Sequence, residues 1–229
     1  MLIAGFDPGL RRPAVAVLDR EPGSLSVNVV DIGFGVDTMK AKGAYKSEAW
    51  LFQPEPKKLK VQTLMYRMQR VDFLASRIMN MLHRNGVTHL AVEGYALRPS
   101  GSDMLAVELV AEVFGRCWRS NIALRQYPVQ HIKLFATGKG NADKTAMVEV
   151  ATKRFLSNLE QYRDSKAIED IADALSIANL LHFELLAREN PTLVPNMPEP
   201  TRRVFNSVTK TNPINLLSQD FAQRKGSHE

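Results

Sequence analysis

Four acidic residues lie next to apolar segments of the sequence, where a carboxylate is unexpected. Asp7 ends the apolar run LIAGF and precedes Pro8-Gly9, and Glu93 ends a second short apolar run, HLAV. Asp170 and Asp173 lie three residues apart in EDIADALSIANLL, so a helix would place both on one face. Carboxylates at two strand ends and on one helix are a pattern that could bind metal ions.

The surroundings of the helical pair are apolar. The face that carries both acids continues through Ala174, Ile177, Leu180 and Leu181. Carboxylates at the rim of a buried stripe need a partner, because an unpaired charge is costly to remove from water. Lys166, one turn earlier, could serve one acid, whereas a divalent cation would serve both. Mg²⁺ binds carboxylate oxygens and fills its remaining positions with water and substrate phosphate, and paired ions catalyse phosphodiester cleavage.

Each acid also has an ordinary interpretation within its own segment. Asp before Pro-Gly is common turn chemistry, and Glu93 would suit a strand end that faces water. The helical pair would suit a solvated helix face. Spacing alone does not bring the four acids together, so the residues leave a metal site and these ordinary roles open.

The elements that must position the acids follow from the hydrophobic pattern. Three strands are predicted in close succession, which is typical of an antiparallel meander: 2–7, 13–18 and 25–33. Two later strands alternate with helices. These strands are predicted at 88–93 and 122–127, and the helices at 61–84, 103–119, 128–135, 142–156 and 167–189. The order predicts an α/β fold with a mixed sheet.

Two segments depart from this pattern. Residues 36–60 are predicted to be a basic inserted loop, because they contain six lysines: Lys40, Lys42, Lys46, Lys57, Lys58 and Lys60. After Asn190, prolines interrupt every periodicity, and 191–229 is predicted to be an irregular or disordered tail with a short helix near 214–223. The folded domain is therefore predicted to span 1–190.

The composition indicates which class of molecule the protein binds and in which compartment it resides. The formal net charge of +6 favours a polyanion such as nucleic acid, because Lys and Arg displace counterions from phosphates. A single cysteine, Cys117, excludes an internal disulfide and suits the reducing cytoplasm, and we expect it to be a core thiol on a helix. No run approaches the roughly 18 apolar residues of a membrane span, and no signal-peptide pattern precedes the first strand.

Four segments, in this order, resemble the RuvC family of Holliday junction resolvases in the ribonuclease H-like superfamily. They are GFDPGLRRPAVAVLD, HLAVEGY, GKGNADKTAMV and EDIADALSIA, and they cover most of residues 1–185. The resemblance implies a mixed five-stranded sheet, three antiparallel strands first, flanked by helices. It also implies that the metal ligands are Asp7, Glu93, Asp170 and Asp173. Lys144 falls on the lysine of the family's GxGxAxK stretch, near the nuclease site.

The activity implied by this resemblance is that of a crossover junction endodeoxyribonuclease in DNA recombination and repair. Such an enzyme uses two Mg²⁺ ions per site, with Mn²⁺ able to replace them, and acts as a homodimer. It cuts Holliday junctions or other branched DNA, such as forks and flaps, by paired symmetric nicks. The expected location is the cytoplasm of a bacterium or of a phage-infected host, with no membrane association.

Some features depart from the typical family pattern. The insertion at 36–60 and the tail after 190 are long. Ala96, preceded by Tyr95, stands where members often carry an aromatic residue. These departures resemble the RuvC-like nucleases encoded by bacteriophages, and they leave the preferred sequence at the cut undetermined.

Two other classes of function compete with a nuclease. A protein that binds branched DNA without cutting it could use the same fold, although it would have no need for all four acids. A sugar kinase or actin-like ATPase also ends its first strand in an Asp-x-Gly turn, but it needs a second, duplicated domain. The 229 residues contain no internal repeat to supply one.

Overall fold

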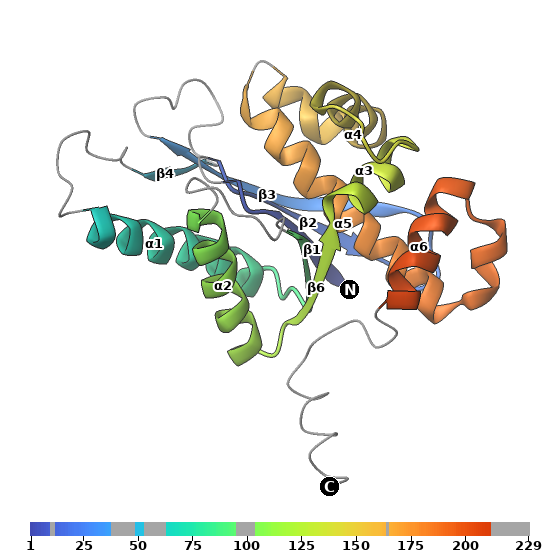
Figure 1. The fold of residues 1–229 in the computed structure, drawn as a ribbon, viewed down its shortest axis with the longest axis horizontal. Coiled ribbons are helices and arrows are strands. Elements are labelled where there is room, and N and C mark those ends of the chain that lie inside the picture. Colours follow the sequence, from blue (N-terminus) through green and yellow to red (C-terminus); the bar gives the residue numbers. More distant parts are fainter. Residues whose placement is uncertain (10–11, 38–48, 53–62, 95–103, 164, 212–229) are drawn as a thin grey trace, which may run out of the picture.

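The protein is built around one six-stranded mixed sheet (Figure 1). It is seen in a computed structural model that describes residues 1–9, 12–37, 49–52, 63–94, 104–163 and 165–211. The strand order is β4-β3-β2-β1-β5-β6. The strands are β1 (Leu2–Asp7), β2 (Ala14–Arg20), β3 (Val27–Asp37), β4 (Ala49–Phe52), β5 (His89–Gly94) and β6 (Ala123–Pro128). The first three are antiparallel, as predicted, and β5 and β6 run parallel to β1.

Strand β4 corrects the predicted strand count from five to six. The sequence predicts a loop throughout 36–60, but the residues AWLF within it form a strand parallel to the end of β3, with Phe34 opposite Ala49. Aromatic and aliphatic residues suit an edge strand, and four of them suffice here although lysines surround them in the sequence. The six lysines themselves lie outside the described residues.

Helices cover both faces of the sheet, at the positions that the periodicity predicts. On one face, α1 (Thr63–Arg84) packs beside α2 (Met104–Arg119). On the other, α5 (Ala167–Glu189) crosses the central strands, with α3 (Val129–Thr137) and α4 (Lys144–Leu159) against it (Figure 1). Each face therefore has its own hydrophobic core, and the sheet is buried between them.

The contact between α5 and β1 is unusually close. A Cβ atom at Gly5 would lie 2.2 Å from the backbone oxygen of Ala174 and 2.4 Å from the backbone nitrogen of Ala178. Only glycine in the strand, facing alanines in the helix, lets the two backbones approach this far. The approach fixes the first turns of α5 beside the carboxyl end of β1.

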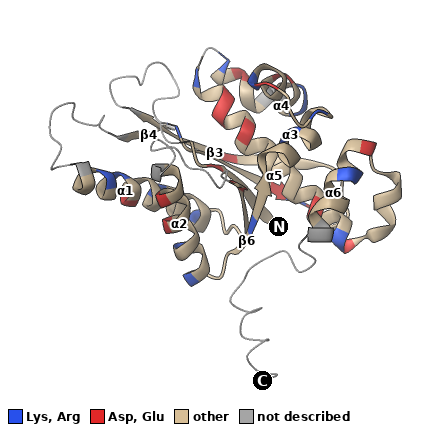
Figure 2. Ribbon diagram, viewed as in Figure 1, with Lys and Arg blue, Asp and Glu red and all other residues tan. Residues whose placement is uncertain are grey.

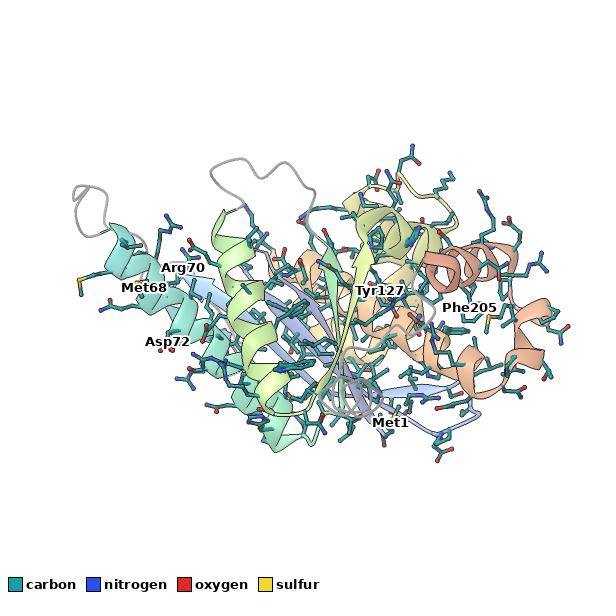
Figure 3. The ribbon with its side chains drawn as sticks, turned by 60° about the horizontal axis from the view of Figure 1, so that its bottom comes forward. Met1, Met68, Arg70, Asp72, Tyr127 and Phe205 are labelled. Atoms are coloured by element: carbon teal, nitrogen blue, oxygen red, sulfur yellow. The ribbon has the colours of Figure 1, made fainter. Side chains whose placement is uncertain are left out.

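A buried polar contact holds the later part of α5 to β6. Glu184 is 3% exposed and accepts hydrogen bonds from Arg125 Nε at 2.9 Å and from the Tyr127 hydroxyl at 2.6 Å. Arg188, one turn along α5, donates to its other oxygen at 2.6 Å. Tyr127 accordingly lies between β6 and α5 (Figure 3). Because each buried oxygen has a donor, this network stabilises the helix position rather than leaving an unpaired charge.

The segment after Asn190 is more ordered than the sequence predicts. A 3₁₀ helix at Pro191–Asn196 is followed by α6 (Glu199–Thr211), whose Val204 and Val208 are buried in the core beside α3. The prolines do not prevent this helix, because Pro200 occupies its first turn, where no intrahelical partner for an N–H is needed. The short helix expected near 214–223 lies outside the described residues, and the domain boundary at 190 stays a prediction.

Two expectations from composition can be compared with the described residues. Cys117 is fully buried in α2, as expected, and burial raises the pKa of its thiol to about 12, so the thiol stays protonated. Among the described helices, none combines the length and apolarity that a membrane crossing requires.

Candidate functional site

Asp7 and Glu93 end two neighbouring parallel strands at the same edge of the sheet. The pairing of β1 with β5 places Phe6 opposite Val92, so the next residue of each strand is an acid. Paired strands lie about 4.8 Å apart, which brings the two carboxylates close together. Gly9 then turns the chain back: a Cβ there would lie 3.2 Å from the backbone oxygen of Arg12.

Asp170 and Asp173 lie in the first two turns of α5, against the same edge (Figure 2 shows the acidic positions at this end of the helix). Burial raises the pKa of Asp7 well above its ordinary value, and the charges of Asp173, Glu93 and Asp170 raise it further. The structure thus brings all four sequence-predicted acids within electrostatic reach of one another.

The other three carboxyl groups are also perturbed, mainly by removal from water. Burial raises the pKa of Asp173 to about 7, helped by the charges of Glu93 and Asp170. Burial likewise raises the pKa of Asp170 to about 6, although the charge of Arg12 opposes it. The pKa of Glu93 is raised by burial too, against the charges of two lysines. Burial and mutual repulsion thus make each of these carboxyl groups hold its proton to a higher pH than an exposed carboxyl group does.

Among the described residues, three basic side chains surround the acids, and only Lys144 of these three is predicted from the sequence to belong to the site. Lys144 begins α4 and its Nζ lies 3.3 Å from Glu169 Oε2. Burial lowers its pKa, but the hydrogen bond to Glu169 and the nearby charges of Asp170 and Asp173 outweigh this and raise it. The side chain is 62% exposed, which leaves it accessible to a ligand.

Arg12 and Lys133 are site residues that sequence reasoning missed. Arg12 Nε lies 2.6 Å from Asp170 Oδ2, and the charge of Lys133, on α3, reaches Glu93. The order of the predicted strands and helices, rather than any local pattern, could have indicated both residues. The Arg12 turn joins β1 to β2 at the edge where Asp7 lies, and α3 begins where the parallel strand β6 ends. Tyr95 and Ala96 lie outside the described residues.

The acids fit hard divalent cations by their chemistry. Among the described residues, no three His, Cys, Asp or Glu side chains are arranged to hold one ion between them, and Asp170 is paired with Arg12. Mg²⁺, however, commonly takes only one or two carboxylates and completes its octahedron with water and phosphate. Two ions shared by four carboxylates would also relieve the repulsion that raises the pKa of Asp7. The donor set therefore suits Mg²⁺ better than it suits the soft metals that prefer sulfur or imidazole.

The raised pKa values predict an unusual pH dependence of the metal-free protein. Between about pH 4 and pH 7 the folded state binds more protons than the unfolded state, because the pKa values of Asp170 and Asp173 are about 6 and about 7 when folded. The free energy of unfolding contributed by these groups is therefore full at low pH and falls as pH rises through that window. Urea unfolding in EDTA at pH 5, 6, 7 and 8 should show this loss, and Mg²⁺ should reverse it at pH 8. Asp173→Asn should flatten the slope; an unchanged slope would contradict the coupling of these acids.

Comparison with known proteins gives a consistent result at the level of the fold. No protein-family model matches the chain, and no curated protein matches it in sequence. Among solved structures, Thermus thermophilus RuvC is similar, at 20% identity and a TM-score of 0.56, over 82% of this chain and 96% of that one. T. thermophilus RuvC in complex with a Holliday junction substrate gives 20% identity and a TM-score of 0.57, over 82% and 95%.

The yeast mitochondrial Holliday junction resolvase Ydc2 is also similar, at 15% identity and a TM-score of 0.49, over 90% of this chain and 83% of that one. Identities this low establish shape rather than activity. The two RuvC structures match nearly their whole length, so the likeness covers the complete RuvC domain. The chain therefore has the RuvC-like, ribonuclease H-like α/β fold that its four sequence segments predict.

Proposed function

We propose that the protein is a Mg²⁺-dependent, structure-specific endonuclease that nicks Holliday junctions or other branched DNA. The observation that carries this proposal is the electrostatic convergence of Asp7, Glu93, Asp170 and Asp173 at one edge of a RuvC-like sheet. A similar structure, T. thermophilus RuvC, is a complex with a Holliday junction. The net charge of +6 supports a polyanionic substrate, since the acids needed for chemistry then lie within a basic molecule.

The four acids have distinct roles in this proposal. Two bound Mg²⁺ ions, or Mn²⁺ in their place, would supply an activated water for in-line attack on phosphorus and would neutralise the leaving 3′ oxygen. Asp7 would help to hold both ions, because it lies within electrostatic reach of Glu93, Asp170 and Asp173. Glu93 would be a ligand from β5, and Asp170 and Asp173 would be ligands from α5.

The basic residues position the DNA backbone. Lys144 is exposed at the start of α4 and lies within reach of the charges of Asp170 and Asp173, so it holds the scissile or an adjacent phosphate. Lys133 supplies a second positive charge beside Glu93. Arg12 forms an ion pair with Asp170. We propose that a cation bound by Asp170 would compete with this ion pair and so leave the guanidinium available for a phosphate.

A nicking assay over a panel of DNA structures tests the proposal. The substrates are a four-way junction, a three-way fork, a flap and the matching linear duplex, each with Mg²⁺, Mn²⁺ or EDTA. We expect ligatable, symmetrically paired nicks in the junction, at least about tenfold faster than in the duplex, and none in EDTA. Paired nicks also imply two sites, so light scattering should show a homodimer.

The same panel separates the competing function. Tight binding to branched DNA without cleavage in either metal would favour a protein that binds junctions without cutting them. Cleavage of the duplex at the same rate as the junction would contradict structure specificity while leaving a nuclease. A bacteriophage origin, suggested by the long insertion and tail, stays a prediction.

A further inference from the structure

A hollow lies among the helices, away from the acids. Its volume is about 360 Å³, within the range of small-molecule sites, and it is lined by α3, α4, α5, Pro198, the first turn of α6, and Leu25 from the segment before β3. Three phenylalanines line it: Phe135, Phe155 and Phe183. Phe135 and Phe183 meet edge to face, with ring centroids 5.4 Å apart. The wall is thus largely apolar and aromatic, and it is shaped by packed side chains from several elements.

One buried polar atom in this wall has no partner. Asn179 lines the hollow and is 6% exposed, and its Oδ1 accepts no hydrogen bond from the described residues. Ser176, one turn earlier on α5, donates to the backbone oxygen of Ala172. A buried acceptor without a donor is costly, and native proteins usually satisfy it. Less than 1 Å² of this oxygen is accessible, so a ligand's N–H or O–H in the hollow would reach it only after the Asn179 side chain turns toward the hollow.

The only charged side chain among the described residues lining the hollow is Arg154, on α4. Its guanidinium carbon lies 5.8 Å from the centre of the Phe155 ring and 5.3 Å from that of Phe183. The neighbouring Lys153 pairs with Glu149, whereas no described acid forms an ion pair with Arg154. Two aromatic rings thus hold a cation without a counter-ion at the wall of the hollow.

This hollow is separate from the acid site. Asn179 lies six residues beyond Asp173 on α5, about 9 Å further along the helix axis and on a different face. None of the four acids lines the hollow. A ligand there would therefore contact none of the proposed metal-binding residues.

From these contacts we infer that the hollow is a binding site for a small organic anion with a flat apolar body and one hydrogen-bond donor. The anionic group pairs with Arg154, the body packs against the three phenylalanines, and the donor bonds to Asn179 Oδ1 once that side chain has turned toward the hollow. A single cation suits one anionic group rather than the repeated phosphates of a nucleic acid strand. This inference does not depend on the proposed nuclease activity.

The dye 8-anilinonaphthalene-1-sulfonate tests this inference, because it combines a sulfonate, two aromatic systems and an amine N–H. We expect saturable, one-site fluorescence enhancement with the full chain. Arg154→Met and Asn179→Leu should each weaken dye binding at least about tenfold. Lys153→Met removes the same charge from the adjacent residue, which is 73% exposed, and should bind as tightly as wild type.

Two further measurements separate loss of the site from loss of the fold. Asn179→Leu removes the unpartnered oxygen, so its melting temperature should equal or exceed that of wild type while dye binding is lost. Ala136→Phe, which fills the hollow from α3 without altering a charge, should abolish binding as well. Unchanged binding in both Arg154→Met and Asn179→Leu would overturn the site. Displacement of the dye by a short oligothymidylate would contradict the inference that the hollow binds a small molecule rather than a nucleic acid strand.

Discussion

Replacing Asp7 with Asn is expected to lower Mg²⁺-dependent nicking of a four-way junction at least about a thousandfold while junction binding changes only slightly. Asp7 has the largest expected effect because it is the acid whose pKa all three other acids raise, which places it at the centre of the cluster. The amide keeps the size of the side chain but removes the charge that two cations would share. Single-turnover cleavage and gel mobility shifts in Ca²⁺ measure the two properties separately.

Asp72→Asn is the matched control for this substitution. Asp72 is 71% exposed on α1 (Figure 3) and pairs with Arg116 at 2.6 Å, and α1 covers the face of the sheet opposite α5. It should cleave and bind as wild type does. Asp7→Asn should also be more stable than wild type in EDTA at pH 8, because a buried, repelled carboxylate is gone. If Asp7→Asn nicked the junction as fast as wild type, the assignment of Asp7 as a metal ligand would be contradicted.

Replacing Gly5 with Val is expected to lower the free energy of unfolding by about 3 kcal/mol or more. A Cβ at this position would lie 2.2 Å from the Ala174 backbone oxygen, and a helix backbone cannot rotate away as a side chain can. Relief requires α5 to move off β1, which would also carry Asp170 and Asp173 away from Asp7. We therefore expect nicking to fall even at temperatures where the variant remains folded.

Gly115→Ala is the control for a glycine that lacks this constraint. Gly115 lies inside α2, and an added Cβ would meet only the flexible end of Arg119, at 3.4 Å. Alanine is favoured over glycine in a helix by about 0.5–1 kcal/mol, so this variant should be as stable as wild type or more stable. Urea unfolding measures both variants. Equal stability of Gly5→Val and wild type would mean that α5 does not pack on β1 at this distance.

The sequence predicted the elements well where a hydrophobic pattern is long. The strand predicted at 2–7 is Leu2–Asp7, and the helix predicted at 167–189 is Ala167–Glu189. Strand β4 was missed because four residues are too few to show a period within a lysine-rich segment. Helix α6 was missed because its prolines were taken to break a helix, whereas they precede it or lie in its first turn.

The candidate site was predicted only in part. The helical acids could be suspected from the apolar face they share, but no local pattern brings Asp7 and Glu93 together with them. That proximity depends on the strand order and on the close packing at Gly5. Only the RuvC resemblance predicted that the four acids lie together. Arg12 and Lys133 lacked any local signal, because their partners belong to distant segments.

The placement of the acids on β1, β5 and α5 has a consequence for synthesis on the ribosome. The meander of β1, β2 and β3 contains only local pairings and can form early, whereas Asp170 and Asp173 lie in a helix near the end of the described chain. A nascent chain can thus fold its sheet around Asp7 before the last two carboxylates have left the exit tunnel. The four-acid cluster is therefore completed only after α5 has been synthesised and has left the tunnel, so a shorter nascent chain holds no complete cluster.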